Sequence, residues 1–198
     1  IALAFVVLPF TANAQFGKSE IFASYGVLPA SKFLDVAKIE LPSTTYLEGS
    51  TKYSTNNKKS KGAFNIGYSF HINDKIAVGL AFSYSKTEKD VVIGSSVPQG
   101  KQTNKYLVFM PNVKYYWFSA KIVKLYSRVA VGVVSAKANA DFIADSYGGK
   151  MEMDNKSNSI AWQASPIGIE VGIKPIAAFA EGGFGYMGCA QLGVRFRF

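Results

Sequence analysis

The chain has 198 residues with a formal net charge of +9, and 48% of its residues are hydrophobic. This length predicts a single domain, and the one cysteine, Cys189, excludes an internal disulfide framework. No apolar run after residue 15 approaches the roughly 20 residues of a spanning helix, which excludes a helical membrane protein.

The first predicted element is an export signal. Residues 1–14 carry no charge and combine an apolar run with the A-x-A cleavage sequence Ala12-Asn13-Ala14. We expect residues 1–14 to be a signal peptide, truncated at its start and removed before Gln15; Pro9 disfavours the alternative, a buried N-terminal helix. An exported chain rarely meets nucleic acid, so its positive charge favours anionic lipid headgroups or lipopolysaccharide phosphates, with ordinary solubility charge as the alternative.

Eight segments then alternate apolar with small or polar residues, which is the period of a strand. In chain order, we expect strands at about 18–28, 64–72, 76–85, 105–118, 122–136, 159–172, 176–184 and 188–198. In the seventh, Phe179 and Glu181 fall on the same face unless a bulge intervenes, so its parity stays open. Long polar connections, at 29–61, 86–104 and 137–157, alternate with short turns such as Asn73-Asp74 and Lys174-Pro175.

The long and short connections fall at opposite ends of the predicted sheet, and the apolar and polar residues fall on opposite faces of its strands. Short turns at one end and long loops at the other are typical of an outer-membrane barrel, as are strands of about 10 residues. In the last segment, Phe196 and Phe198 share one face while Arg195 and Arg197 share the other. A soluble lipocalin-type barrel would place its large apolar residues inside. These features predict an all-β fold, an eight-stranded antiparallel up-and-down transmembrane β-barrel over residues 15–198.

The charges on the inward face predict a charge network. Arg128, Glu170, Arg195 and Arg197 would face an interior that is just wide enough for side chains. Buried charges must be paired and hydrogen-bonded. We therefore expect these four residues to plug the barrel, with Glu20, Lys114 and Glu181 as further candidates.

Other motifs carry little chemistry. The sequence Gly183–Gly188 matches G-x-G-x-x-G, but a strand follows where dinucleotide binding needs a helix, so we expect a tight hairpin. The single histidine, His71, is expected to face inward at the turn end as a structural residue. Acidic residues at 141–154 lack the spacing of a calcium loop, and Cys189 reads as a small packed residue. We expect no catalytic residue, no cofactor and no metal.

The chain resembles the small eight-stranded outer-membrane β-barrel proteins of Gram-negative bacteria, the OmpA/OmpX-like group with its porin-like domain. The resemblance is carried by Ala12-Asn13-Ala14, residues 166–172, Phe179-Ala180-Glu181, residues 183–186 and the terminal Arg195-Phe196-Arg197-Phe198. It implies that the barrel-assembly machinery recognises the terminal strand with Phe196 and Phe198. It also implies that a catalytic group would lie near the extracellular side, away from His71.

Together these features predict a non-enzymatic integral outer-membrane protein, exported through the periplasm and monomeric. It would stabilise the envelope and display surface loops, with outer-membrane lipid and lipopolysaccharide as partners and no nucleic acid. The loop lysines 32, 38, 52, 58, 59 and 61 are by default a solvated run of charge, and the alternative is that they pair with lipid phosphates. The alternatives left open are a small porin-like channel for ions or small solutes, a lipid A-modifying barrel enzyme and a secreted soluble carrier.

Overall fold

The computed structural model describes residues 19–32, 53–93, 98–144 and 149–198. The expected signal peptide and its cleavage site lie outside these residues. In chain order the elements are β1 (Ser19–Val27), the 3-10 helix η1 (Ala30–Lys32), β2 (Tyr53–His71), β3 (Ile76–Ile93), β4 (Pro98–Ser119), β5 (Val123–Ala144), β6 (Gly149–Ile173), β7 (Ile176–Gly185) and β8 (Ala190–Arg197).

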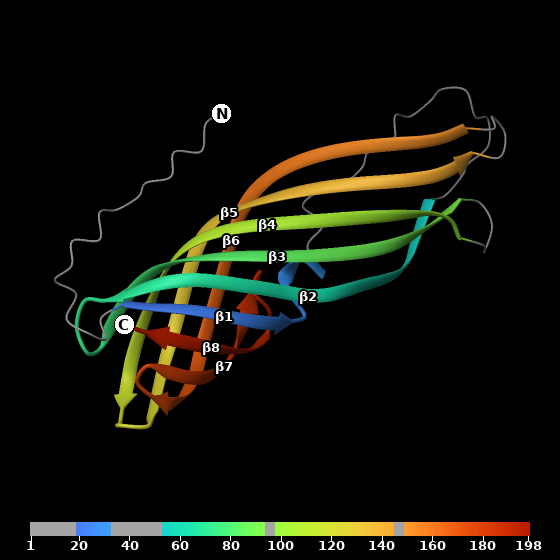
Figure 1. Ribbon diagram of the computed structural model, residues 1–198. Helices are drawn as coiled ribbons and strands as arrows, with labels where there is room; N and C mark the ends of the chain where they lie inside the picture. The colour runs from blue at the N-terminus through green and yellow to red at the C-terminus, as the bar shows by residue number, and fades with distance from the viewer. Residues whose placement is uncertain (1–18, 33–52, 94–97, 145–148) are drawn as a thin grey trace.

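The eight strands form one closed barrel in which each strand pairs antiparallel with the next (Figure 1). The barrel closes where β8 pairs with β1, and the backbones of Ser19 and Phe198 exchange hydrogen bonds of 3.2 and 3.0 Å. The predicted eight-stranded antiparallel up-and-down barrel is therefore confirmed. Among the described residues, no helix is long and apolar enough to cross a membrane.

Tight turns join the strands at one end, which we call the turn end. Between β2 and β3, the Asn73 side chain accepts hydrogen bonds from the backbone N–H groups of Lys75 and Ile76, at 2.9 and 2.8 Å. The chain passes from β4 to β5 at residues 120–122 and from β6 to β7 at residues 174–175, at the same end. The expected short turns are in these places, and the opposite end is the loop end.

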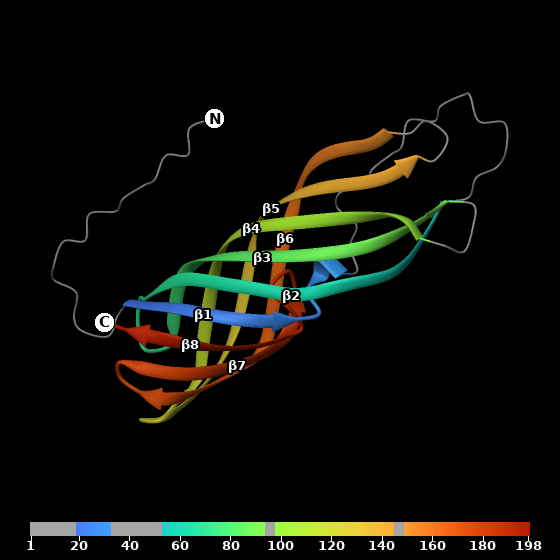
Figure 2. The same ribbon diagram turned by 45° about the vertical axis from the view of Figure 1, so that its right-hand side comes forward.

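The strands of one wall are much longer than the sequence predicted. β2 to β6 have 18 to 25 residues, against 8 to 10 for β1, β7 and β8. Figures 1 and 2 show these five strands extending past the other three toward the loop end. The expected loops 86–104 and 137–157 are therefore wrong in large part, because the paired strands continue through them, and the end of the expected loop 29–61 is wrong from Tyr53 onward. Residues 33–52 of that loop lie outside the described residues. Backbone pairing continues past the apolar segments, where no hydrophobic alternation marks it.

The two faces of the barrel differ sharply in polarity. Outward residues are large and apolar, with Val129 57% and Leu192 69% exposed, whereas the inward Arg128 and Arg195 are each 1% exposed. Phe179 and Glu181 both face inward and are buried, which settles the parity of β7. The irregularity in the β6–β7 pairing lies on the β6 side instead, between Ala164 and Ile167. A soluble barrel has its large apolar side chains inside, so its two faces have the opposite polarity.

Candidate functional site: a charge network inside the barrel

Among the described residues, seven buried charged side chains from six strands lie inside the barrel. Each occupies an inward position of its strand, because successive side chains alternate between the two faces. They are Glu20 on β1, Lys114 on β4, Arg128 on β5, Glu170 on β6, Glu181 on β7, and Arg195 and Arg197 on β8, and each is buried. Four buried cations thus face three buried carboxylates.

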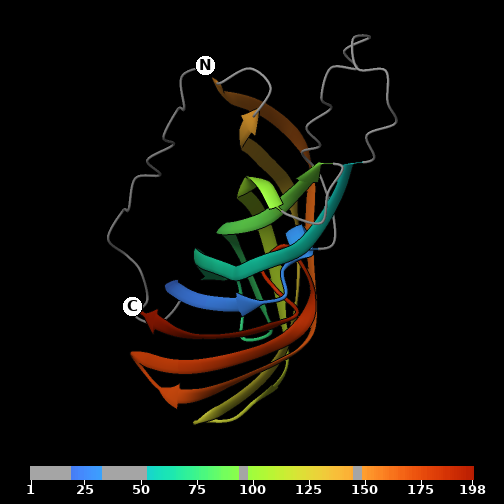
Figure 3. The ribbon, with the colours of Figure 1, turned by 90° about the vertical axis from the view of Figure 1, so that its right-hand side faces the viewer.

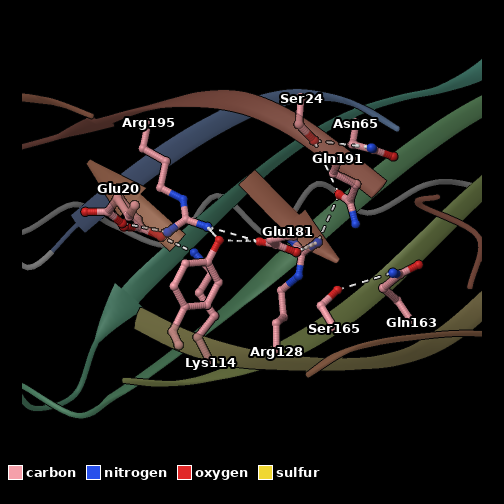
Figure 4. Close-up of polar contacts among 12 residues, drawn as sticks. Glu20, Ser24, Asn65, Lys114, Arg128, Gln163, Ser165, Glu181, Gln191 and Arg195 are labelled. Atoms are coloured by element: carbon pink, nitrogen blue, oxygen red, sulfur yellow. Dashed lines mark hydrogen bonds and ion pairs between the residues drawn. The ribbon is translucent and has the colours of Figure 1, made fainter. Parts of the chain in front are cut away.

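Glu181 is the meeting point of two arginines. Arg195 Nη2 lies 3.1 Å from Glu181 Oε1, Arg128 Nη2 contacts Glu181 Oε2, and the Tyr126 hydroxyl donates to Oε1 at 2.6 Å. Figure 4 shows both guanidinium groups converging on this carboxylate. Arg195 also donates to the Tyr126 hydroxyl and lies over the Phe179 ring at 4.0 Å. The inward Phe179 is therefore a platform for the arginine.

Glu20 and Glu170 hold the part of the network nearer the turn end. Glu20 contacts Lys114 Nζ, Arg197 Nε at 3.3 Å and His71 Nε2 at 3.2 Å. Glu170 pairs with Arg195 Nη1 at 2.7 Å and Arg197 Nη2 at 2.5 Å. Arg195 and Arg197 therefore link all three carboxylates into one network. Such a network is worth more than isolated pairs because each buried charge has compensating partners.

The placement of the expected site residues differs in one respect from the sequence reasoning. Arg195 and Arg197 contact Glu170, but Arg128 contacts Glu181, which the sequence offered only as a further candidate. Sequence reasoning missed Tyr126 altogether. Its signal was available, because Tyr126 shares its parity with Arg128 on β5 and so had to face inward.

His71 and Cys189 are predicted from the sequence to have structural roles, and both contact other residues inside or at the end of the barrel. His71 lies at the turn end of β2, bonded to Glu20 and stacked on Tyr116 with ring centroids 5.4 Å apart. Cys189 is a half-buried free thiol at the loop end, whose Sγ donates to the Leu28 carbonyl at 3.2 Å. No group of three or more potential metal ligands occurs in the described part of the chain.

A second layer fills the interior toward the loop end, where the chain folds inward. The turn between β7 and β8 places Met187 fully inside: Asn65 Nδ2 donates to its carbonyl at 3.1 Å, and its N–H donates to Gln163 Oε1 at 2.9 Å. Gly188 has a φ of +116°, a conformation that favours glycine. The G-x-G-x-x-G sequence is thus a hairpin turn that fills the barrel mouth. 

η1 closes the same end from the other side. It packs against β2 and β3, and Figure 3, with the loop end toward the viewer, shows it within the curve of these strands. Ser31 is fully buried, and its hydroxyl lies 2.9 Å from that of Ser85. Two separate segments of the chain therefore cover the charge network from the loop end.

The terminal aromatic residues lie on the outside. Phe196 is exposed on the outer face of β8, and its ring centroid is 6.2 Å from that of Phe198. Both positions are accessible at the turn end, beside the strand that closes the barrel.

Tyr126→Phe tests how tightly the network is satisfied. Removing the hydroxyl takes a partner from both Arg195 and Glu181, so we expect the free energy of unfolding to fall by about 1.5–3 kcal/mol. Urea unfolding in detergent micelles measures this change. Tyr115→Phe is the matched control, because Tyr115 faces outward and its loss of a hydroxyl should cost under about 0.5 kcal/mol. Equal effects of the two substitutions would contradict the network.

Comparison with known proteins gives matches among solved structures. Ail, the attachment invasion locus protein of Yersinia pestis, matches with 15% identity over 92% of this chain and 99% of that chain, at a TM-score of 0.48. Ail in complex with the heparin analogue sucrose octasulfate matches with 17% identity over 92% and 99%, at 0.47. The N-terminal β-barrel domain of Pseudomonas aeruginosa OprF matches with 17% identity over 93% and 100%, at 0.38. No family model and no curated protein matches the chain.

Proposed function

We propose that this chain is an integral, non-enzymatic outer-membrane β-barrel protein with a closed interior. The observation that carries the proposal is the polarity of its two faces. Large apolar side chains are exposed on the outside, while seven charged side chains are buried inside. In water this arrangement would expose a continuous apolar belt far larger than the patches of soluble monomers. In a bilayer the same belt contacts lipid, and the closed barrel satisfies every backbone group within it.

The closed interior favours a structural role over transport. Eight strands leave room only for side chains, and here ion pairs occupy the middle while Met187 and η1 cover the loop end. The tall wall of β2 to β6 extends beyond the other strands and gives the protein a surface to display outside the membrane. Envelope stabilisation and surface display, including adhesion, are the roles that this shape supports.

The proposed partners follow from the same features. Lipid and lipopolysaccharide would surround the apolar belt, and the exposed Phe196 beside Phe198 would present the terminal strand to the barrel-assembly machinery. The chain would act as a monomer, because the barrel closes on itself where β8 pairs with β1 and the unpaired edges of β2 and β6 are confined to their loop-end extensions. A lipid A-modifying activity has little support, since His71 lies at the turn end and is bonded to Glu20.

Membrane fractionation with gel migration tests the proposal. We expect the protein to stay with the outer-membrane fraction through a high-salt wash and to require detergent for release. Its migration on a denaturing gel should change between unheated and boiled samples, because a closed barrel resists the detergent until it is heated. A protein that leaves the membrane in salt and migrates identically in both samples would be a soluble carrier.

Planar-bilayer recording tests the closed interior. We expect no steps in ion conductance from the purified protein at moderate voltage, because ion pairs block the lumen on both sides of Arg195. An empty-detergent addition and a known wide porin serve as negative and positive controls. Regular conductance steps that scale with protein concentration would instead support the channel alternative.

A further inference from the structure

Lysines lie side by side on the outer face of five successive strands. The register places Lys86 opposite Lys105, Lys105 opposite Lys137, and Lys137 opposite Lys156. On β2, Lys61 lies at the bulge that faces Lys86. We call this set the lysine row: Lys61, Lys86, Lys105, Lys137 and Lys156.

The lysine row follows the loop-side edge of the apolar belt. Its members share the outward face with the exposed apolar residues, because they lie at the same parity or, on β2, at the bulge. Each is two to four residues beyond an exposed large residue of the apolar belt on its strand, namely Phe64, Tyr84, Leu107, Val133 and Ile160. All are exposed except Lys86, which is half-buried. The charges are thus placed at the level where hydrocarbon gives way to headgroups.

Within the protein this arrangement is unfavourable. Neighbouring strands are about 4.8 Å apart, and like charges directly opposite each other destabilise a sheet. Lys86 has a carboxylate partner, Glu88, at 2.8 Å. For the other four lysines the described part of the chain supplies no ion-pair partner. An anion from outside would turn this repulsion into attraction.

We propose that the lysine row binds the phosphate groups of lipids in the outer leaflet. This inference rests on the proposed function, because it needs the belt to lie in a membrane. Lysine stems can lie along the belt while the ammonium groups reach the phosphates, and basic residues at a bilayer surface attract anionic lipid. Five lysines over about 20 Å can hold more than one phosphate group.

The apolar residues next to the row favour a lipid over a soluble anion. Tyr84 and Leu107 lie directly below Lys86 and Lys105 on the same face and are 45% and 59% exposed. A lipid bound through its phosphate would place its acyl chains on these side chains, whereas a soluble anion would leave them uncovered. Of the lysines predicted from the sequence, only Lys61 belongs to this row. 

The test compares two double variants in mixed micelles. K105Q/K137Q removes two adjacent, exposed members of the row, and K75Q/K121Q removes two exposed lysines at the turn end as a matched control. The probes are diphosphorylated lipid A, dephosphorylated lipid A with the same acyl chains, and inorganic pyrophosphate. Native mass spectrometry of the intact protein measures the affinity for each probe. Gel migration of each variant confirms that the barrel is folded.

We expect the wild-type protein and K75Q/K121Q to prefer the diphosphorylated lipid, and K105Q/K137Q to bind it on the order of tenfold more weakly. Equal loss in both variants, or no preference for the phosphorylated lipid, would overturn the proposal. Binding of pyrophosphate as tight as that of lipid A would overturn the choice of a lipid. In each of these cases the proposed function still holds if the protein is in the outer-membrane fraction and its gel migration changes on heating. A protein that fractionates as soluble would refute that function instead.

Discussion

Replacing Arg195 by methionine should lower the free energy of unfolding by about 3–5 kcal/mol, the cost of breaking a buried ion pair. The Arg195 guanidinium contacts Glu170, Glu181 and the Tyr126 hydroxyl, and all of these groups are buried. Methionine retains much of the apolar contact with Phe179 but has no charge and no donor. Both carboxylates then lose a cation that no water can replace. Urea unfolding of the protein in detergent micelles measures the change.

A double-mutant cycle separates the network from simple loss of packing. Glu170→Gln combined with R195M should cost less than the sum of the two single changes, by about 0.5–3 kcal/mol, because the pair interacts directly. Lys121→Met is the control for adding methionine, since Lys121 is exposed at the turn end and should change stability by under about 0.5 kcal/mol. Strict additivity of E170Q and R195M would show that the two side chains do not form a coupled unit.

The sequence predicts well which face a residue takes. The period of two in a strand is strict, so one confident outward residue sets the face of all its neighbours. Arg195 and Arg197 alternate with Phe196, and this sufficed to place both arginines inside. The same argument applied to β7 stopped at Phe179, because an inward aromatic looked inconsistent with an inward Glu181. The structure removes the conflict, since Phe179 lies under Arg195.

Which charges meet across the barrel is beyond sequence reasoning. Arg128 on β5 contacts Glu181 on β7, and Arg197 on β8 contacts Glu170 on β6. Contacts between strands that are not neighbours depend on the strand register around the whole barrel. A bulge shifts that register by one residue, as between Tyr126 and Arg128 in the β5–β6 pairing. The face of a residue follows from the local alternation of its strand, whereas its ion-pair partner depends on how the whole barrel closes.

The long extensions of β2 to β6 were missed for a different reason. In the expected loop at 137–157, the pairing of β5 with β6 continues from Lys137–Lys156 to Ala144–Gly149. Strand prediction relies on one apolar face, and a strand that projects beyond the membrane does not need one. The lysine row was missed for a related reason, because its members lie far apart in the sequence and only the strand register brings them side by side.

Placing an arginine on the outer belt gives the most direct test that the belt faces lipid. Val129 is an outward residue of β5, 57% exposed, near the middle of the apolar part of its strand and opposite Val113. In a bilayer, Val129→Arg should cost about 2–4 kcal/mol of folding free energy, because the charge lies at the midplane. In a soluble barrel the same substitution at an exposed site would change stability by under about 0.5 kcal/mol.

Ser135→Arg is the matched control on the same strand and face. Ser135 lies opposite Leu107 and only two residues from Lys137, at the edge of the belt, so its arginine can reach the headgroups. We expect a cost of about 0–1 kcal/mol for this variant, measured with Val129→Arg by urea unfolding from lipid vesicles. The contrast depends on depth alone, since both variants add the same side chain to the same strand. Equal costs would show that the two positions share one environment, and the belt would then not be the surface on which a bilayer acts.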